Sequence, residues 1–268
     1  MASEYDEHWV YGPDYIPWMS GRIVEALQLG PAGRIADIGS GTGLFAREVA
    51  QQLQPRHPIL CVDPSEAMLS QLGTPPPADL TPIVASAEDI AEGRTQLPYE
   101  QLDAMWLKES VHHVADPAHT LRGLADRLAP GGWLLVVMLP ATIQYPLFEA
   151  ALARFEELQP DPAVIEGHMR AAGLEAGLSY VEHELRIDRD KYLGMVRARY
   201  MSLLSTFSDS EIEKGIEEMR VAHPEPVLVF PDRFAFILGQ RGGESSRVCC
   251  ESAGQSHSLM AATSTVAS

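Results

Sequence analysis

The sequence has no run of eighteen consecutive apolar residues, and residues 1–8 contain three acids and no Lys or Arg. A helix that spans a membrane needs about twenty apolar residues, and a secretory signal needs a basic start and an apolar centre. Neither segment is therefore expected, and we predict a cytoplasmic protein that contacts no membrane.

Cysteine is scarce, with three residues in the 268-residue chain. Cys61 falls in a predicted buried strand, and Cys249 and Cys250 are adjacent in a polar segment. Disulfide scaffolds and structural zinc sites need more cysteines, at defined spacings. The sequence therefore predicts neither a disulfide framework nor a metal site.

Basic residues are few: 20 Lys and Arg stand against 37 Asp and Glu, which gives a net charge of −17, and they form no cluster. Proteins bind the phosphate backbone of nucleic acids through clustered Lys and Arg. A nucleic-acid partner is therefore not expected. The acidity itself does not identify a substrate, because many acidic surfaces only keep proteins soluble.

Three glycines at alternate positions, Gly39, Gly41 and Gly43, follow an apolar strand predicted at residues 35–38 and precede a helix predicted at 44–53. Glycine adopts backbone conformations that other residues rarely reach, and it lets a ligand approach the backbone closely. The segment therefore predicts a strand-turn-helix unit that binds a ligand at its turn.

The spacing of the turn argues against a dinucleotide. Dinucleotide-binding turns have a third glycine at the position that Leu44 occupies here. Asp37 precedes the glycines by two residues, where a carboxylate would repel a pyrophosphate and attract a cation. A second predicted strand, residues 59–63, ends in Asp63, placed to accept hydrogen bonds from ribose hydroxyls. The turn and the two acids predict S-adenosylmethionine as the ligand.

From residue 34 to about residue 140 the chain resembles the class I S-adenosylmethionine-dependent methyltransferases. The glycine turn with Asp37 is similar to the first motif of that family, and Asp63 to its ribose-binding acid. Residues 83–90 resemble the third strand and the adenine loop, with Ser86 where an Asp is usual. Residues 102–108 resemble the fourth strand, and the stretch from Asp116 to Leu139 resembles the next helix, turn and fifth strand. The segments occur in the order of the family.

The resemblance implies which residues bind S-adenosylmethionine. The glycine turn would hold the methionine part, Asp63 the ribose, and two residues of the third loop the adenine edge. The backbone of the last residue of the fourth strand would complete the site. The predicted cofactor-binding residues are Asp37, Gly39, Gly41, Gly43, Asp63, Ser86, Ala87, Glu88 and Lys108.

Candidates for catalysis follow the fourth strand, between Lys108 and His113. Methyl transfer from a sulfonium depends largely on alignment of the two groups, and a base helps when the nucleophile carries a proton. His112 or His113 could be that base, or could only pack the loop. Glu109 could bind a substrate amine, or could pair with Lys108. The tetrapeptide typical of amino-methyltransferases is absent here, which argues against an amide or a base nitrogen as acceptor.

Two segments are predicted to enclose the substrate. An aromatic-rich arm precedes a helix predicted at residues 19–29. Such an arm often covers the cofactor in this family, with Tyr11 as the candidate contact, or its aromatic residues could only dock the arm onto the core. A helical insertion at 188–222 resembles the roofs of small-molecule methyltransferases. Arg197, Arg199 and Tyr200 in this insertion could reach the pocket, where the two arginines would suit an anionic substrate, or the arginines could simply be solvated.

Within the insertion, the spacing of Tyr192, Val196, Tyr200 and Leu204 predicts one helix with a buried face. Ser208 and Glu211 have the spacing of a capping box, which predicts the start of a second helix.

The predicted fold is α/β and Rossmann-like: a seven-stranded, mostly parallel sheet with helices on both faces, an antiparallel last strand, and the helical substrate roof before that strand. The sixth strand is predicted at residues 178–187 and the seventh at 234–239. The proline-rich segment 73–82 is predicted to be a surface loop.

We predict a single domain over residues 1–241. Residues 1–33 form its arm and first helix, and residues 34–140 form the cofactor-binding core. Residues 242–268 are rich in Ser, Ala, Thr and Gly and are predicted to be disordered. The oligomeric state stays open.

The predicted function is transfer of a methyl group from S-adenosylmethionine to a small-molecule acceptor, which leaves S-adenosylhomocysteine. A transfer-RNA or protein methyltransferase on the same fold is the nearest alternative, and a cofactor-binding homologue without activity is another. A dehydrogenase ranks third because of Leu44. The acceptor atom stays open among oxygen, nitrogen, sulfur and carbon.

Overall fold

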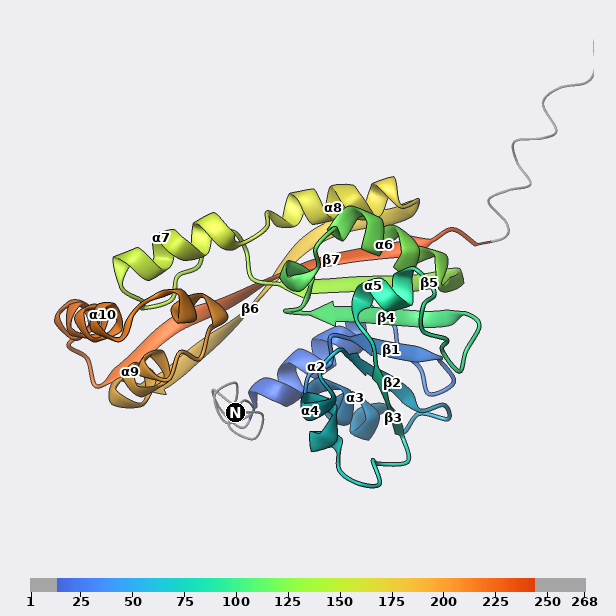
Figure 1. Ribbon diagram of the computed structural model, residues 1–268, viewed down its shortest axis with the longest axis horizontal. Helices are drawn as coiled ribbons and strands as arrows, with labels where there is room; N and C mark the ends of the chain where they lie inside the picture. The colour runs from blue at the N-terminus through green and yellow to red at the C-terminus, as the bar shows by residue number, and fades with distance from the viewer. Residues whose placement is uncertain (1–13, 244–268) are drawn as a thin grey trace, which may run out of the picture.

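A computed structural model describes residues 14–243 of the protein. Its strands form one sheet and are β1 (Ile35–Ile38), β2 (Ile59–Asp63), β3 (Leu80–Val84), β4 (Leu102–Lys108), β5 (Leu128–Met138), β6 (Leu174–Asp188) and β7 (Val227–Arg241). Their order is β3-β2-β1-β4-β5-β7-β6. Strands β1 to β5 pair in parallel, and β7 is antiparallel to β5 and β6 (Figure 1). The predicted fold class is confirmed.

Helices cover both faces of this sheet. They are α2 (Tyr15–Ala26), α3 (Leu44–Leu53), α4 (Glu66–Leu69), α5 (Ala87–Ala91), α6 (Pro117–Asp126), α7 (Glu149–Leu158), α8 (Pro162–Ala171), α9 (Arg189–Arg197) and α10 (Asp209–Ala222), with short 3-10 turns η1 (Ser70–Leu72), η2 (Val111–His113) and η3 (Ser202–Thr206). On one face, α2 and α3 pack through a core that includes Val49 and Trp106. On the other, α5, α6 and α8 pack through a core that includes Leu124 and Met169. Because the central parallel strands are buried on both faces, they are apolar at nearly every position.

The last two strands form a hairpin that extends beyond the sheet. β6 and β7 pair from Leu174 opposite Arg241 to Asp188 opposite Val227. β5 pairs with β7 only from Ala235 to Gln240, so the other half of β7 has β6 as its hydrogen-bonded neighbour. Figure 1 shows this half of the hairpin carrying α9 and α10 away from the parallel strands. We call α9, η3 and α10 (residues 189–222) the roof, and they confirm the predicted helical insertion.

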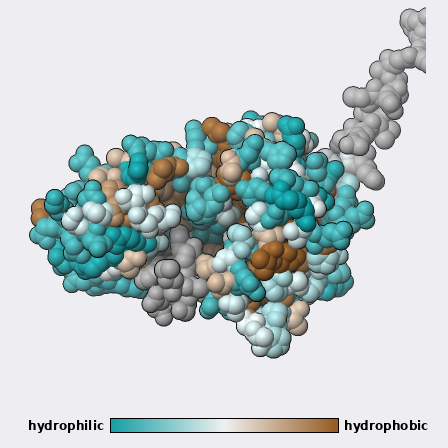
Figure 2. All heavy atoms as spheres, in the orientation of Figure 1, coloured by the Kyte–Doolittle hydropathy of each residue, from teal (hydrophilic) through white to brown (hydrophobic). Residues whose placement is uncertain are grey.

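The roof has a buried apolar side and a charged outer side. Its inner residues Tyr192, Val196, Leu204, Ile212 and Ile216 are each at most 1% exposed. In the face drawn in Figure 2 the surface of this lobe is mostly hydrophilic. α10 begins at the predicted capping box, in which the side chains of Ser208 and Glu211 each bond to the other's backbone.

Some predicted boundaries are wrong for identifiable reasons. The helix predicted at 19–29 begins at Tyr15, because Pro17 falls in its first turn, where the missing N–H is not needed. β3 begins at Leu80, inside the predicted loop, because Pro82 is tolerated on an edge strand. β7 begins at Val227 because Pro231 lies where the strand pairs with β6 alone. β6 extends beyond the predicted 178–187 at both ends as the partner of β7.

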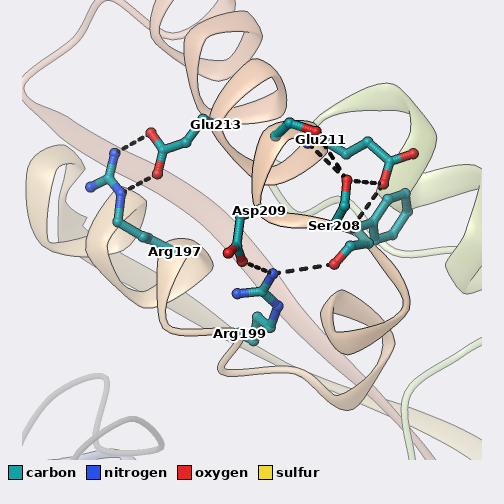
Figure 3. Close-up of polar contacts among 8 residues, drawn as sticks. Arg197, Arg199, Ser208, Asp209, Glu211 and Glu213 are labelled. Atoms are coloured by element: carbon teal, nitrogen blue, oxygen red, sulfur yellow. Dashed lines mark hydrogen bonds and ion pairs between the residues drawn. The ribbon is translucent and has the colours of Figure 1, made fainter.

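The single helix predicted through residues 192–204 is also wrong. α9 ends at Arg197, and Arg199 adopts a left-handed backbone conformation with a φ of 57°. The Arg199 guanidinium donates to the Asp209 carboxylate at 2.7 Å and to the Phe207 carbonyl at 3.2 Å (Figure 3). These contacts come from the far side of the turn, so the local helical pattern does not reveal them.

None of the helices within residues 14–243 combines the length and the apolar composition needed to cross a membrane.

Candidate functional site

A cavity of about 430 Å³ opens at the carboxyl ends of β1, β2 and β4. This volume is within the range of small-molecule sites, and the location is where α/β sheets bind ligands. The predicted cofactor-binding residues that line it are Asp37, Gly39, Gly41, Asp63, Ser86, Ala87, Glu88 and Lys108. Gly43 lies behind the turn, outside the lining. Glu109 and His113 line the cavity as well.

The glycine turn requires glycine for two separate reasons. Gly39 and Gly43 have φ values of 77° and 74°, in the left-handed region. A Cβ on Gly39 would lie 2.5 Å from the Cβ of Ser110, in the loop after β4. A Cβ on Gly43 would lie 2.5 Å from the Cδ2 of Leu72, which is the end of a flexible side chain. A side chain at Gly39 is therefore excluded by an atom next to the backbone, whereas a side chain at Gly43 meets an atom that can move away.

Asp63 ties the glycine turn to the loop after β2. Its Oδ2 accepts the Gly41 N–H at 2.9 Å, and its Oδ1 accepts the Ser65 N–H at 2.8 Å. Each carboxylate oxygen has a second lone pair, so both oxygens retain acceptor capacity on the cavity side. The residue thus fixes the turn and presents a carboxylate to the ligand.

Asp37 is a nearly buried acid at the end of β1, with 3% of its surface exposed. Burial raises its pKa to about 8, although the charge of Lys108 acts in the opposite direction. A cation in the cavity would favour the ionised form of this carboxyl. A cationic ligand beside Asp37 would therefore increase the negative charge of this group.

The third loop is held by a capping box that the sequence analysis did not identify. Ser86 Oγ accepts the Asp89 N–H at 3.1 Å, and Asp89 Oδ2 accepts the Ser86 N–H at 3.0 Å. Glu88 Oε1 accepts the Ala115 N–H at 3.2 Å and so joins α5 to the loop after β4. The spacing of Ser86 and Asp89 was the available signal.

The end of β4 brings a lysine and an acid into the cavity wall. The Lys108 Nζ lies 4.6 Å from the centre of the Phe45 ring, and burial lowers its pKa. Glu109 has a φ of 51°, and its Oε1 accepts the Leu139 N–H at 2.8 Å. Burial raises the pKa of Glu109 to about 7. Glu109 therefore also anchors the end of β5, and one of its oxygens is already engaged.

The structure separates the two candidate histidines. His113 is exposed and lines the cavity, whereas His112 is half-buried and is not in the lining. Their ring centres lie 4.1 Å apart. Burial lowers the pKa of His112 to about 4, with His113 as the second cause. His113 is thus the histidine that can meet a ligand.

The other candidate substrate residues are not brought to the cavity. Tyr11 lies outside residues 14–243. Arg199 is engaged by Asp209 at the joint between η3 and α10, close to the ion pair of Arg197 with Glu213 (Figure 3). Tyr200 is buried inside the roof.

Asp232 and Tyr145 are polar residues near this site that the sequence analysis missed. The Tyr145 hydroxyl donates a hydrogen bond to Asp232 Oδ1, and Asp232 is 0% exposed. The available signal was the alternation of apolar residues at even positions of β7, which Asp232 interrupts. The seventh strand was predicted to begin only at residue 234, so Asp232 was not placed in it.

Comparison with known proteins agrees with this geometry. The family model described as a methyltransferase domain matches residues 36–134. The chain is 28% identical over 119 residues to the ubiquinone/menaquinone biosynthesis C-methyltransferase UbiE of Geobacter sulfurreducens, which covers 42% of this chain and 44% of that protein. It is 30% identical over 199 residues to the acetylserotonin O-methyltransferase of Mus musculus, which covers 67% and 47% respectively. The chain thus spans about half the length of these relatives.

A solved structure supports the fold. The putative methyltransferase from an antibiotic biosynthesis pathway of Anabaena variabilis superposes with a TM-score of 0.64 at 18% identity, over 83% of this chain and 96% of that one. Residues 36–134 thus form a methyltransferase domain of the class I S-adenosylmethionine-dependent type, and its cofactor is S-adenosylmethionine.

Proposed function

We propose that the protein transfers the methyl group of S-adenosylmethionine to a small-molecule acceptor bound between the cavity and the roof. The observation that carries this proposal is the meeting of four separate segments, the ends of β1, β2 and β4 and the start of α5, at one cavity. Acidic residues and a glycine-rich turn line it, which suits a ligand with a ribose and cationic groups.

The residues of the cavity have distinct proposed roles. Asp37 and the glycine turn hold the methionine part, Asp63 accepts from the ribose, and Ala87 with Glu88 contacts the adenine edge. When bound, S-adenosylmethionine supplies a methyl group activated by the positive sulfur. The protein then has to align the acceptor with this methyl and exclude water, and alignment alone can supply much of the rate.

A small acceptor is favoured over a macromolecule by the roof and by the charge. In Figure 1 the roof and the outer half of the hairpin lie on the side of the sheet toward which β4 points, and the net charge of −17 opposes a nucleic acid. The names of the two relatives also describe enzymes that act on small molecules. A transfer-RNA or protein substrate remains the alternative that acceptor screening tests.

Asp63→Ala should weaken S-adenosylmethionine binding by about 1–3 kcal/mol, which corresponds to about 5- to 150-fold, because hydrogen bonds to a charged group are lost. Isothermal titration with S-adenosylmethionine and S-adenosylhomocysteine measures this change. Asp103→Ala is the matched control. Asp103 lies at the start of β4, at the end of the strand away from the cavity, and pairs with Arg34. Removal of its carboxylate should leave the affinity for S-adenosylmethionine unchanged. Equal affinities of Asp63→Ala and the native protein would refute the ribose assignment.

His113→Ala should lower kcat by about 100-fold or more, the scale of general-base catalysis, without a change in cofactor affinity. His112→Ala should keep kcat within about two-fold, because this ring is set back from the cavity and is neutral near pH 7. Steady-state kinetics with titration of S-adenosylhomocysteine separates the two variants. Full turnover of both would show that the reaction proceeds by alignment alone. Cofactor affinity without turnover on any acceptor would instead indicate an inactive homologue.

A further inference from the structure

Asp232 is a carboxylate in the middle of an apolar row. Alternate residues of β7, namely Leu228, Phe230, Phe234 and Phe236, belong to the core on one face of the sheet. Asp232 occupies the central position of this row and is 0% exposed. A buried carboxylate costs several kcal/mol unless hydrogen bonds and an opposite charge compensate it. The position therefore needs a specific partner.

The described residues satisfy Asp232 only in part. The hydroxyl of Tyr145 donates to Oδ1, whereas Oδ2 has no hydrogen-bond partner within residues 14–243. Burial raises the pKa of Asp232 to about 6, and Tyr145, Lys108 and Tyr15 act against this rise. At neutral pH the carboxyl is therefore mostly ionised, and the Tyr15 hydroxyl acts on it as a weaker second donor.

Lys108 connects Asp232 to the cofactor cavity. Its side chain lines the cavity, and its Nζ lies 5.2 Å from the ring centre of Phe234, the next residue of the β7 row. Burial lowers the pKa of Lys108, and the carboxyls of Glu109, Asp232 and Asp37 oppose this change. Asp232 thus lies beside the cavity, where β7 leaves the sheet for the roof.

Aromatic rings lie on the roof side of Asp232. The ring centres of Tyr145 and Phe230 are 5.3 Å apart, and those of Tyr192 and Phe230 are 5.4 Å apart. Tyr200 shares a hydrogen bond of 2.9 Å with Tyr192, and its raised pKa is due to burial and, to a smaller extent, to the charge of Asp232. The faces of aromatic rings attract cations, and a carboxylate among them adds a full negative charge. This combination suits an organic cation and disfavours an anion.

We propose that Asp232 binds a protonated amine of the methyl acceptor, with the rings of Tyr145, Phe230 and Tyr192 around it. This inference rests on the proposed function, because it names the substrate class of the same site. Since Asp232 is shielded from solvent, an acceptor reaches it only when the protein opens beside this residue. The structural alternative is that Asp232 only fastens Tyr145 to the hairpin.

The test uses sets of small molecules that share one skeleton and differ in charge. The first set is tyramine, tyrosol and 4-hydroxyphenylacetate, which end in an ammonium, a hydroxyl and a carboxylate. Hexylamine, hexanol and hexanoate form an aliphatic set. Binding is measured by isothermal titration to the full chain saturated with S-adenosylhomocysteine, for the native protein, Asp232→Asn and Tyr145→Phe. Asp232→Asn keeps the shape and removes the charge, whereas Tyr145→Phe keeps the ring and the charge and removes the hydrogen bond.

The native protein should bind the ammonium member of at least one set about 10-fold or more tightly than its neutral partner. This preference for the ammonium member should disappear in Asp232→Asn and persist in Tyr145→Phe. If Asp232 only held Tyr145 in place, the two variants would lose the same hydrogen bond and would behave alike. Absence of any ammonium preference in the native protein, including absence of binding, overturns the inference, as does a preference that survives in Asp232→Asn. Failure to bind S-adenosylhomocysteine itself would instead overturn the proposed function, and the inference with it.

Discussion

Gly39→Ala should weaken S-adenosylmethionine binding by about 100-fold or more, a loss near 3 kcal/mol. The new Cβ would lie 2.5 Å from the Cβ of Ser110, and two carbon atoms need at least about 3.5 Å. Because the Ser110 Cβ is bonded directly to the backbone, the clash moves the turn by roughly 1 Å. The residues on either side of Gly39 line the cavity, so the displacement changes the surface that meets the cofactor. Isothermal titration with S-adenosylhomocysteine measures the loss.

Gly43→Ala is the matched control for this variant. Gly43 has nearly the same φ as Gly39, 74° against 77°, so both changes impose a similar strain on the backbone, about 1–2 kcal/mol. The Cβ at Gly43 meets the mobile end of Leu72, and Gly43 does not line the cavity. Its cofactor affinity should therefore fall much less. Equal losses in the two variants would show that backbone strain, rather than contact with Ser110, determines the effect.

The cofactor core was predictable because local signals there agree with the tertiary structure. The strands β1, β2 and β4 and the helix α3 have the predicted bounds. A short apolar run between turn residues is a strong signal in a parallel strand that is buried on both faces. The glycine spacing likewise reports a backbone requirement at the same positions.

The roof and the acceptor side were less predictable, because their geometry depends on distant contacts. The left-handed turn at Arg199 occurs at a residue that rarely adopts it, and the partner that holds it, Asp209, lies across the turn. Pro231 indicates a loop when it is considered locally, yet it fits the free side of a two-stranded hairpin. Because the seventh strand was predicted to begin only at residue 234, Asp232 was left out of it. A charged residue among alternating apolar residues of a buried strand departs from the usual pattern, and such departures occur mainly at functional sites.

Asp37→Asn should stabilise the cofactor-free protein above pH 8 and at the same time weaken S-adenosylmethionine binding. Burial raises the pKa of Asp37 from 3.8 to about 8. Between these two values the folded protein holds a proton that the unfolded chain has released, so the stability due to this group is complete below about pH 4 and is lost as the pH rises to 8. Asparagine carries no charge at any pH and avoids this loss. We expect a gain of about 2–3 kcal/mol, or about 5–10 °C in Tm, at pH 8.5.

The ligand reverses this preference, because a cation beside Asp37 favours the ionised carboxyl that asparagine cannot supply. Affinity for S-adenosylmethionine should fall by about 3 kcal/mol, close to 100-fold. Thermal melts at pH 5 and pH 8.5, together with isothermal titration, measure both effects.

Asp103→Asn is the control, because the pKa of Asp103 is shifted in the opposite direction. The hydrogen bond from Arg34 lowers this pKa, so the ionised Asp103 stabilises the folded protein at neutral pH and this stabilisation is lost in acid. This variant should be slightly less stable than the native protein at pH 8.5 and should bind the cofactor normally. The proposed role of Asp37 would be refuted if Asp37→Asn were no more stable than the native protein at pH 8.5, or if it bound the cofactor equally well. Asp37 would then not be a carboxyl whose ionised form is stabilised by the bound ligand.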